Sequence, residues 1–291
     1  MAKSISRVQL QKIVGSITKF YPAELADSAW DNTGLLIDCS VEETTPITNP
    51  KVLLTVDLTQ EVAQEAIEKD CSVIIAYHPF IFPSFKSIAP TKNPQHKSML
   101  KLIQNGISVY SPHTAVDAAK GGVNDWLAEG LGKFQQGSIA QSISIEAARA
   151  CPGDESIGYG RLVTLAGDGI KLSDLIANIK TALGLEHFQV SSNYASQSDK
   201  LVKTVGLCAG SGSGVFKALS PKQQEAVDVY YTGELSHHEV LRLKELGKIV
   251  ITCNHSNTER GYLAAVMQKN LKNEGIDTIV SVTDHDPLVF V

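Results

Sequence analysis

Short apolar runs alternate with amphipathic segments along the chain, and this alternation restricts the folds that the chain can adopt more than any other feature. Each run spans three to six residues, and the segments between them carry apolar residues at helical spacing. Strands that alternate with helices form parallel sheets flanked by helices, because parallel neighbours need a crossover connection. The sequence therefore predicts an α/β fold, with strands at 52–56, 73–76, 107–110, 202–207, 227–232 and 249–251.

The length indicates two lobes, because 291 residues are many for one domain and few for three. Between 133 and 156 the periodicity fades and small polar residues gather. We therefore expect a first α/β lobe at 1–135, a connecting segment at 136–158 and a second α/β lobe at 159–291.

Composition and charge exclude several classes of protein. A net charge of -5 and 43% hydrophobic residues argue against a protein that coats nucleic acid or binds a membrane surface. No apolar run approaches the ~20 residues that span a bilayer. The five cysteines show no CxxC spacing, which is typical of reduced intracellular thiols, so we expect no structural disulfides.

The first 23 residues allow two interpretations. They contain basic residues and serines but no acid, as a mitochondrial transit peptide does. However, Val8, Ile13, Val14 and Ile17 have helical spacing and run into sequence typical of a folded domain. We favour a first helix of the fold and expect a cytoplasmic protein, with nuclear or mitochondrial location as alternatives.

The stretch after the run at 249–251 carries two good metal ligands, His255 and Glu259. It is expected to lie where an α/β fold presents its chemistry, in the crevice at the carboxyl end of a strand. The same residues allow a plainer interpretation, because Ser256 and Glu259 have the spacing of a capping box at a helix start. This stretch alone does not separate the two.

Other potential ligands occupy equivalent places in the sequence. His78, His113 with Asp117, and Glu234 with His238 each follow an expected strand at its carboxyl end. If those strands share a crevice, imidazoles and carboxylates converge in a site suited to Zn, Fe or Mn. A bridging carboxylate such as Glu259 could hold two ions, and the reaction class that follows is hydrolysis.

Two further polar stretches have alternative interpretations. The glycine cluster at 210–214 could bind phosphate through backbone N–H groups, but it lacks the third glycine of a dinucleotide motif and the lysine of a P-loop. A tight turn with close packing is favoured. Asp31 and Asn32 could line a site, although turn chemistry explains them more simply. The sequence contains no Gly-x-Ser-x-Gly elbow and no thiol beside an obvious base.

Several motifs of this sequence resemble those of the NIF-three-like family, many of whose bacterial members carry the label GTP cyclohydrolase 1 type 2. The resemblance runs from Trp30-Asp31-Asn32-Thr33-Gly34 to Asp284-His285-Asp286-Pro287, which is nearly the whole chain. The variant forms look closest to the fungal and animal branch. The motifs between those ends are Tyr77-His78-Pro79, Ser111-Pro112-His113-Thr114-Ala115-Val116-Asp117, Thr232-Gly233-Glu234-Leu235-Ser236-His237-His238 and Asn254-His255-Ser256-Asn257-Thr258-Glu259.

The resemblance implies two similar α/β lobes, a dinuclear metal site in the cleft between them, and ring-shaped hexamers. By matching motif, His78, Asp117 and Glu259 would hold one metal, and His255 with the bridging Glu259 would hold the other. The bacterial pattern has two adjacent histidines before the proline, and Tyr77 stands here in place of the first. A phenol with an ordinary pKa of ~10 is a poor ligand, so we expect one well-held divalent ion and a second that is weak or absent.

Two functions from different classes follow. The first is a metal-dependent hydrolase of a nucleotide-like or other phosphate-bearing small molecule, with His113 or His238 as the proton carrier. The family label suggests GTP ring opening, but no stretch of the sequence indicates a guanine-specific pocket. The second is a non-catalytic, metal-binding interaction protein, since the family takes its name from interaction with a transcriptional adaptor. We expect a homo-oligomer, with the hexamer implied by the resemblance, and neither membrane nor direct nucleic-acid binding.

Overall fold

The computed structural model describes residues 4–42, 47–82, 84–132 and 138–289, and these form two compact units. Unit 1 contains residues 1–116 and 262–285, and unit 2 contains residues 117–261 and 286–291. Each unit is a mixed α/β structure with a sheet flanked by helices, which confirms the predicted fold class.

The sheet of unit 1 has the strand order β1-β4-β3-β2-β13. Its central strands are buried on both faces, as expected of parallel strands covered by helices on each side. Only β1, at one edge, runs antiparallel to its neighbour. The strands are β1 (Gly34–Ile37), β2 (Lys51–Thr55), β3 (Cys71–Ala76), β4 (Ser108–Ser111) and β13 (Asp277–Val280).

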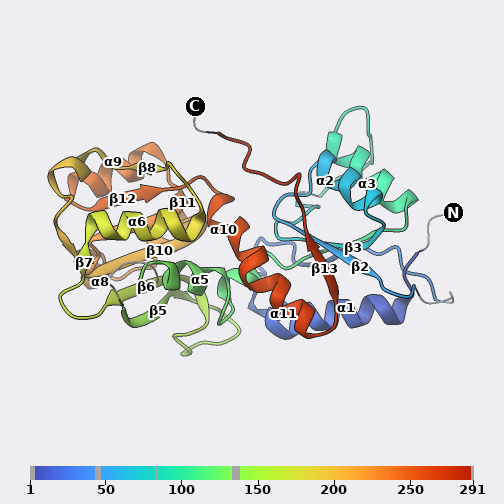
Figure 1. Ribbon diagram of the computed structural model, residues 1–291, viewed down its shortest axis with the longest axis horizontal. Helices are drawn as coiled ribbons and strands as arrows, with labels where there is room; N and C mark the ends of the chain where they lie inside the picture. Colours follow the sequence, from blue (N-terminus) through green and yellow to red (C-terminus); the bar gives the residue numbers. More distant parts are fainter. Residues whose placement is uncertain (1–3, 43–46, 83, 133–137, 290–291) are drawn as a thin grey trace. The chain divides into compact units, whose positions relative to one another are not determined.

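Helices cover both faces of this sheet (Figure 1). On one face α2 (Gln60–Glu68) and α3 (Pro94–Gln104) pack together over a core that includes Leu53, Ile74 and Val109. On the other face α1 (Arg7–Phe20) packs on α11 (Gln268–Asn273), which follows the π-helix Leu263–Met267 and the helix α10 (Asn257–Tyr262). A short 3-10 helix, Ala23–Leu25, follows α1.

The first helix predicted from the sequence is present. It begins after Ser6, whose side chain forms a capping box with Gln9. Leu10, Ile13 and Ile17 form its buried face, and the hydroxyl of Tyr21 lies 2.7 Å from that of Tyr262. Of the apolar residues whose spacing predicted the helix, Ile13 and Ile17 belong to the core of unit 1, whereas Val8 is 75% exposed.

The sheet of unit 2 has the order β5-β6-β10-β11-β12-β8. Its centre is parallel, from β10 (Thr204–Ser211) through β11 (Val229–Glu234) to β12 (Ile249–Thr252). The outer strands run antiparallel to their neighbours; they are β5 (Ile139–Ala147), β6 (Gly158–Leu165) and β8 (Gln189–Val190). A separate small ladder joins β7 (Ile170–Lys171) to β9 (Leu201–Val202).

The helices of unit 2 also lie on both sides of its sheet (Figure 1). One side carries α5 (Val123–Gly130) and α6 (Leu172–Leu183), which contact each other. The other carries α7 (Ser213–Phe216) and α9 (His237–Glu245), over a core that includes Cys208, Tyr230 and Val250. The remaining helices are α4 (Thr114–Ala118), at the junction of the two units, the 3-10 helix Ser192–Ser196 and α8 (Pro221–Ala226).

The contact division differs from the lobes expected at 1–135 and 159–291. Residues 262–285 return to unit 1, because β13 pairs with β2 and completes that sheet. Part of the expected connecting segment 136–158 is the strand β5, which pairs along β6. Contiguous lobes are the simplest assumption from a sequence, and a returning strand cannot be recognised from its local pattern. The expected boundary at 135–136 lies outside the described residues.

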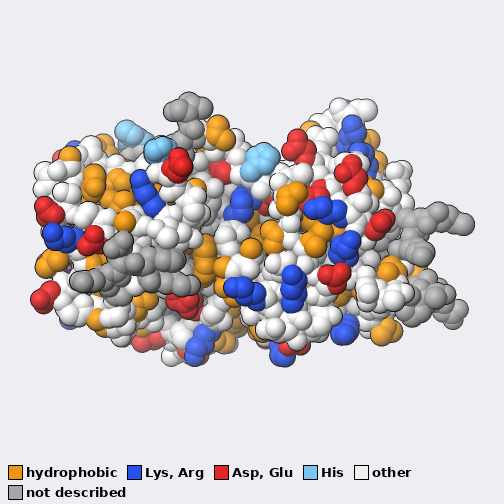
Figure 2. Space-filling model, in the orientation of Figure 1, with side chains coloured by type: hydrophobic (Ala, Val, Ile, Leu, Met, Phe, Trp, Pro, Cys, Tyr) orange, Lys and Arg blue, Asp and Glu red, His pale blue; other side chains and the backbone are white. Residues whose placement is uncertain are grey.

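The chain's surface and thiols agree with the composition. Figure 2 shows acidic and basic side chains interspersed over the visible face. Within the described ranges, no helix is both long and apolar enough to cross a bilayer. All five cysteines are free thiols.

A buried carboxylate holds the segment that follows β13. Glu65, on α2, is 5% exposed and accepts hydrogen bonds from the backbone and side chains of the tail, including the Thr283 hydroxyl at 2.7 Å. Lys69 donates to it at 2.6 Å. Burial alone would raise the pKa of Glu65, but these donors outweigh it and lower the pKa to about 2.

We predict that Glu65→Gln destabilises the protein by about 3 kcal/mol at neutral pH, because buried donors lose a charged acceptor. The contribution is fully present above the ordinary pKa of 4.5 and is lost as the pH falls toward the folded value of about 2. Urea unfolding of the full chain between pH 7 and pH 2 measures it. Glu61→Gln, an exposed change on the same helix, is the control; an equal loss in both variants would contradict the prediction.

Candidate metal centre

The predicted site residues lie at the carboxyl ends of parallel strands, as the sequence indicated. His78 follows β3, His113 follows β4, and His255 follows β12. Glu234 is the last residue of β11. His113 and Asn254, the residue before His255, adopt φ values of 33° and 65° in the left-handed region, which non-glycine residues rarely occupy. The backbone leaves these strands through strained turns of the kind that cluster at functional sites.

His255, just before α10, meets Glu259 in the first turn of that helix. The Nε2 atom of His255 lies 3.4 Å from Oε1 of Glu259, whose side chain is only 3% exposed. On the other side of the ring, Nδ1 of His255 lies 2.9 Å from Oε1 of Glu234. A carboxylate on Nδ1 is the usual partner of a metal-binding histidine, because it fixes the ring and leaves Nε2 for the ion.

Gly210, near the end of β10, leaves open the space in front of these two ligand atoms. A Cβ at this position would lie 2.7 Å from Nε2 of His255 and 2.8 Å from Oε1 of Glu259. The residue also has a φ of 60°, which favours glycine. Residues and open space therefore fit a metal ion bound by an imidazole nitrogen and a carboxylate oxygen.

The glycine cluster has the packing role that the sequence favoured. The backbone N–H of Gly210 donates to the Thr258 hydroxyl at 2.8 Å, and Thr258 donates onward to the carbonyl of His255 at 2.7 Å. A Cβ on Gly233 would lie 2.6 Å from the Gly210 carbonyl oxygen. Three strand ends thus approach more closely than any side chain would allow.

Ser256 does not form the capping box that its spacing with Glu259 allowed. Its hydroxyl donates to Asp286 at 2.8 Å and accepts from Arg260 at 2.7 Å. Glu259 takes part in the helix through a backbone bond to the Ser256 carbonyl. The carboxylate of Glu259 is therefore directed to His255 rather than to the helix start.

Asp117 lies in the same unit as Glu259, on α4. Burial raises the pKa of the Cys208 thiol well above its ordinary value, and the negative charges of Asp117 and Glu259 raise it further. Asn124 donates to the backbone carbonyl of Asp117 and accepts from the N–H of Ala209, which ties α4 to the end of β10. The role of Asp117 as a metal ligand stays a prediction.

His238 occupies a different place from the other predicted residues. It is exposed in the first turn of α9, where its ring lies 5.4 Å from that of His237. Ser236 and Glu239 cap this helix through a capping box. The described part of unit 2 does not bring His238 together with His255, Glu259 and Glu234.

Unit 1 repeats the histidine–carboxylate pair. Nδ1 of His78 lies 2.9 Å from Oδ1 of Asp57, which stands just past the end of β2. The turn of Asp57 is held by Asp284, whose carboxylate accepts from the backbone N–H of Val56 at 2.7 Å. His78 therefore also directs its Nε2 atom away from a fixed carboxylate.

The two pairs have the same place in the two units. Asp57 and His78 end the neighbouring parallel strands β2 and β3, and α2 connects them. Glu234 and His255 end the neighbouring parallel strands β11 and β12, and α9 connects them. Both separations are 21 residues. Asp57 was not among the residues predicted from the sequence, although this repeated spacing is a signal that identifies it.

A third pair in unit 1 joins His113 to Asp31. Nδ1 of His113 lies 2.6 Å from Oδ1 of Asp31, whose side chain is 1% exposed. Thr33 and Thr114 also donate to this carboxylate. Burial would raise the pKa of Asp31, but the hydrogen bonds and charge of His113 with these donors lower it to about 2. Asp31 therefore does more than form a local turn: it is an ionised, buried partner of His113.

Tyr77 is almost completely buried beside these histidines. Its ring is 1% exposed and lies 5.3 Å from the ring of His78 and 6.1 Å from that of His113. Tyr77 thus packs against both histidines of unit 1.

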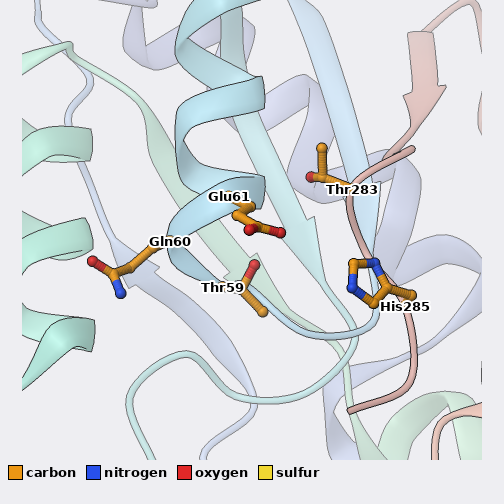
Figure 3. Close-up of a pocket in the computed structure, with 5 residues that line it drawn as sticks. All are labelled: Thr59, Gln60, Glu61, Thr283 and His285. Atoms are coloured by element: carbon orange, nitrogen blue, oxygen red, sulfur yellow. The ribbon is translucent and has the colours of Figure 1, made fainter. Parts of the chain in front are cut away.

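Unit 1 also has a separate open pocket of about 220 Å³ (Figure 3). Figure 3 shows Thr59, Gln60 and Glu61 at the start of α2, with Thr283 and His285 on the tail beside them. Its described lining includes none of the predicted metal ligands.

Comparisons with known proteins agree with this architecture. The family model described as Duf34/NIF3 (NGG1p interacting factor 3) matches residues 8–287. The chain is 54% identical to NGG1-interacting factor 3 of Saccharomyces cerevisiae, over 99% of each chain. It is 45% identical to the NIF3 homolog of Schizosaccharomyces pombe, again over 99% of each. The crystal structure of a hypothetical protein of Staphylococcus aureus matches with a TM-score of 0.76 and 25% identity, covering 99% of this chain and 100% of that one.

We predict that Gly210→Ala keeps the fold but displaces the side chains of His255 and Glu259. The left-handed φ costs about 1–2 kcal/mol for a residue with a Cβ, and the contacted atoms are ends of side chains that can move. Urea unfolding measures the stability, and the NMR chemical shifts of the His255 ring report its displacement. Gly214→Ala is the control, because a Cβ there meets open space. Unchanged His255 ring shifts in Gly210→Ala would contradict the prediction.

Proposed function

Because this chain belongs to the Duf34/NIF3 family, we propose that it is a metal-dependent hydrolase of a nucleotide-like or other phosphate-bearing small molecule. The observation that carries the proposal is the convergence of Nε2 of His255 and Oε1 of Glu259, 3.4 Å apart, on the space beside Gly210. Glu234 supports the imidazole from behind, as a metal ligand requires.

The proposed ligands of the ion are His78, His255 and Glu259, with Asp117 as a further carboxylate ligand. Two imidazole nitrogens and a carboxylate oxygen form a donor set that suits Zn, Fe or Mn. The Nδ1 atoms of both histidines are taken by carboxylates, so each offers Nε2. When bound, a divalent ion supplies Lewis acidity, which polarises the bond to be hydrolysed and favours ionisation of water.

The proposed proton carrier is His113. Asp31 holds its Nδ1 atom, so proton exchange takes place at Nε2. The buried, ionised carboxylate orients the ring through this hydrogen bond. His238, the other residue that the sequence suggested for this role, remains a prediction; its exposure on α9 favours His113.

We predict one well-held metal ion per chain, because Tyr77 is a poor substitute for the second-site histidine. Elemental analysis of the full chain, purified without a metal-binding tag, measures the content. His255→Ala and Glu259→Gln should lose the ion, whereas Glu245→Gln, an exposed change in the same unit, should keep it. Two or more ions per chain at high occupancy would contradict the role given to Tyr77.

We also predict that the carboxylates bonded to the Nδ1 atoms of the histidines set the affinity of the site for the metal ion. Glu234→Ala and Asp57→Ala should each lower metal affinity about 10–100-fold without abolishing binding, because the ring loses its orientation and basicity but keeps its ligand atom. Competition with a chromogenic chelator measures this. Wild-type affinity in both variants would show that the histidine–carboxylate pairs serve only the fold.

A second candidate function is a metal-binding interaction protein without turnover. The observation that favours it is the name of the 54% identical yeast relative, NGG1-interacting factor 3, which implies a protein partner in transcription. Glu259→Gln separates the two functions. Loss of a turnover supports the hydrolase, whereas a partner interaction that survives loss of the metal, with no turnover in wild type, supports the interaction protein.

We propose a homo-oligomer, with the hexamer as the state that family resemblance implies. Light scattering gives its mass directly. A mass near 31.3 kDa in solution would count against any ring.

A further inference from the structure

Two large aromatic side chains are exposed beside His113 in unit 1. Trp30 is 55% exposed and Phe82 is 49% exposed, although neither belongs to the core. Their ring centroids lie 6.0 Å apart at an interplanar angle of 68°. Both rings also stand nearly perpendicular to the His113 imidazole, with centroids 5.6 Å and 6.4 Å away. Trp30 and Phe82, which we call the aromatic pair, thus form a corner next to a predicted proton carrier.

The aromatic pair is held in place by hydrogen bonds despite its exposure. The indole N–H of Trp30 donates to Asp27 at 2.9 Å, and the backbone N–H of Asp27 donates to the Thr114 hydroxyl at 3.0 Å. That hydroxyl donates to Asp31, which holds His113. One continuous network therefore fixes Trp30 relative to the imidazole.

Phe82 is fixed by a hydrogen bond from the loop that carries Trp30. The side-chain amide of Asn32 donates to the backbone carbonyl of Ile81, so the turn that carries Phe82 is tied to the turn after Trp30. Rings that are exposed yet fixed lose little conformational entropy when a ligand covers them. This is the property expected of a binding surface rather than of scattered surface residues.

We propose that the aromatic pair binds the planar heteroaromatic ring of the substrate, a nucleobase or a ring of the same kind, with the ring's polar edge at Nε2 of His113. Stacking on tryptophan and phenylalanine suits any flat ring, because every base has a π-face. Nδ1 of His113 is taken by Asp31, so Nε2 is the nitrogen that faces a ligand. The inference rests on the proposed function only in that it identifies the ligand as the substrate. Binding of the ring itself does not require the metal.

Hydrogen bonding within the protein, rather than charge, favours an uncharged ring over an organic cation. An aromatic cage for a cation draws on the faces of the rings and is strengthened by available carboxylates. Here Asp27 accepts from Trp30 and from the backbone of Ala29, and Asp31 accepts from His113, Thr33 and Thr114. Both carboxylates are therefore already engaged by donors of the protein.

Tryptophan fluorescence tests the proposal in the full chain. The chain has two tryptophans, so Trp126→Phe leaves Trp30 as the single reporter. Adenosine and guanosine are the ring probes, and ribose 5-phosphate is the probe that has the phosphate without the ring. We expect saturable quenching of Trp30 by at least one nucleoside and none by ribose 5-phosphate. Absence of saturable quenching by both nucleosides would overturn the proposal.

Variants of the second ring sharpen the test. Phe82→Leu should weaken nucleoside binding about tenfold, because one stacking face is lost. Phe85→Leu is the matched control in the same loop, since Phe85 is also exposed and contacts His96 instead; it should change the affinity by about twofold at most. Equal effects of the two changes would overturn the proposal.

Two further measurements keep the outcomes separate. If Trp126→Phe does not fold, calorimetry measures nucleoside affinity in the wild-type chain and in Trp30→Leu, both of which retain Trp126. Nucleoside binding should persist in Glu259→Gln and after chelation, so loss of the metal centre and loss of the ring site are distinguishable. If Trp30→Leu instead changes the oligomeric mass and leaves nucleoside binding intact, the aromatic pair is an interface between copies and the proposal is wrong.

Discussion

The hydrogen bond between a carboxylate and histidine Nδ1 is the interaction that sets the geometry of the candidate site. It occurs for His78, His113 and His255, at 2.9, 2.6 and 2.9 Å. A hydrogen bond to a charged group contributes ~1.5–3 kcal/mol, but its larger effect here is geometric. Each ring is fixed in one orientation and presents Nε2, the atom that can bind a metal ion or exchange a proton.

The fold provides these pairs through a repeated unit of strand, helix and strand. Adjacent parallel strands place their last residues side by side, so a carboxylate that ends one strand reaches a histidine that ends the next. In unit 2 the approach of β10 and β11 then requires glycine at 210 and 233. The positive φ values of His113 and Asn254 belong to the same constraint, because the chain must turn sharply at the strand ends.

Much of this arrangement could be predicted from the sequence, because strand and helix periods are local. The alternation of strands and helices, the first helix, and the place of His78, His113 and His255 at strand ends all follow from patterns within a few residues. The return of β13 to unit 1 depends on pairing with β2, more than 200 residues earlier, and no local pattern encodes it. Asp31 shows the same limit, since its partner His113 lies 82 residues away. The role of Ser256 could not be decided from the sequence, because Asp286, which accepts a hydrogen bond from its hydroxyl, is 30 residues distant.

Nitrogen-15 NMR of the histidine rings in the full chain, before and after one equivalent of Zn²⁺, tests whether the carboxylates leave Nε2 free to bind the metal. The Nε2 resonances of His78 and His255 should shift on metal binding while their Nδ1–H signals persist, because Asp57 and Glu234 accept hydrogen bonds from those N–H groups. Metal bound at either Nδ1 atom, or binding that leaves both rings unperturbed, would contradict this prediction.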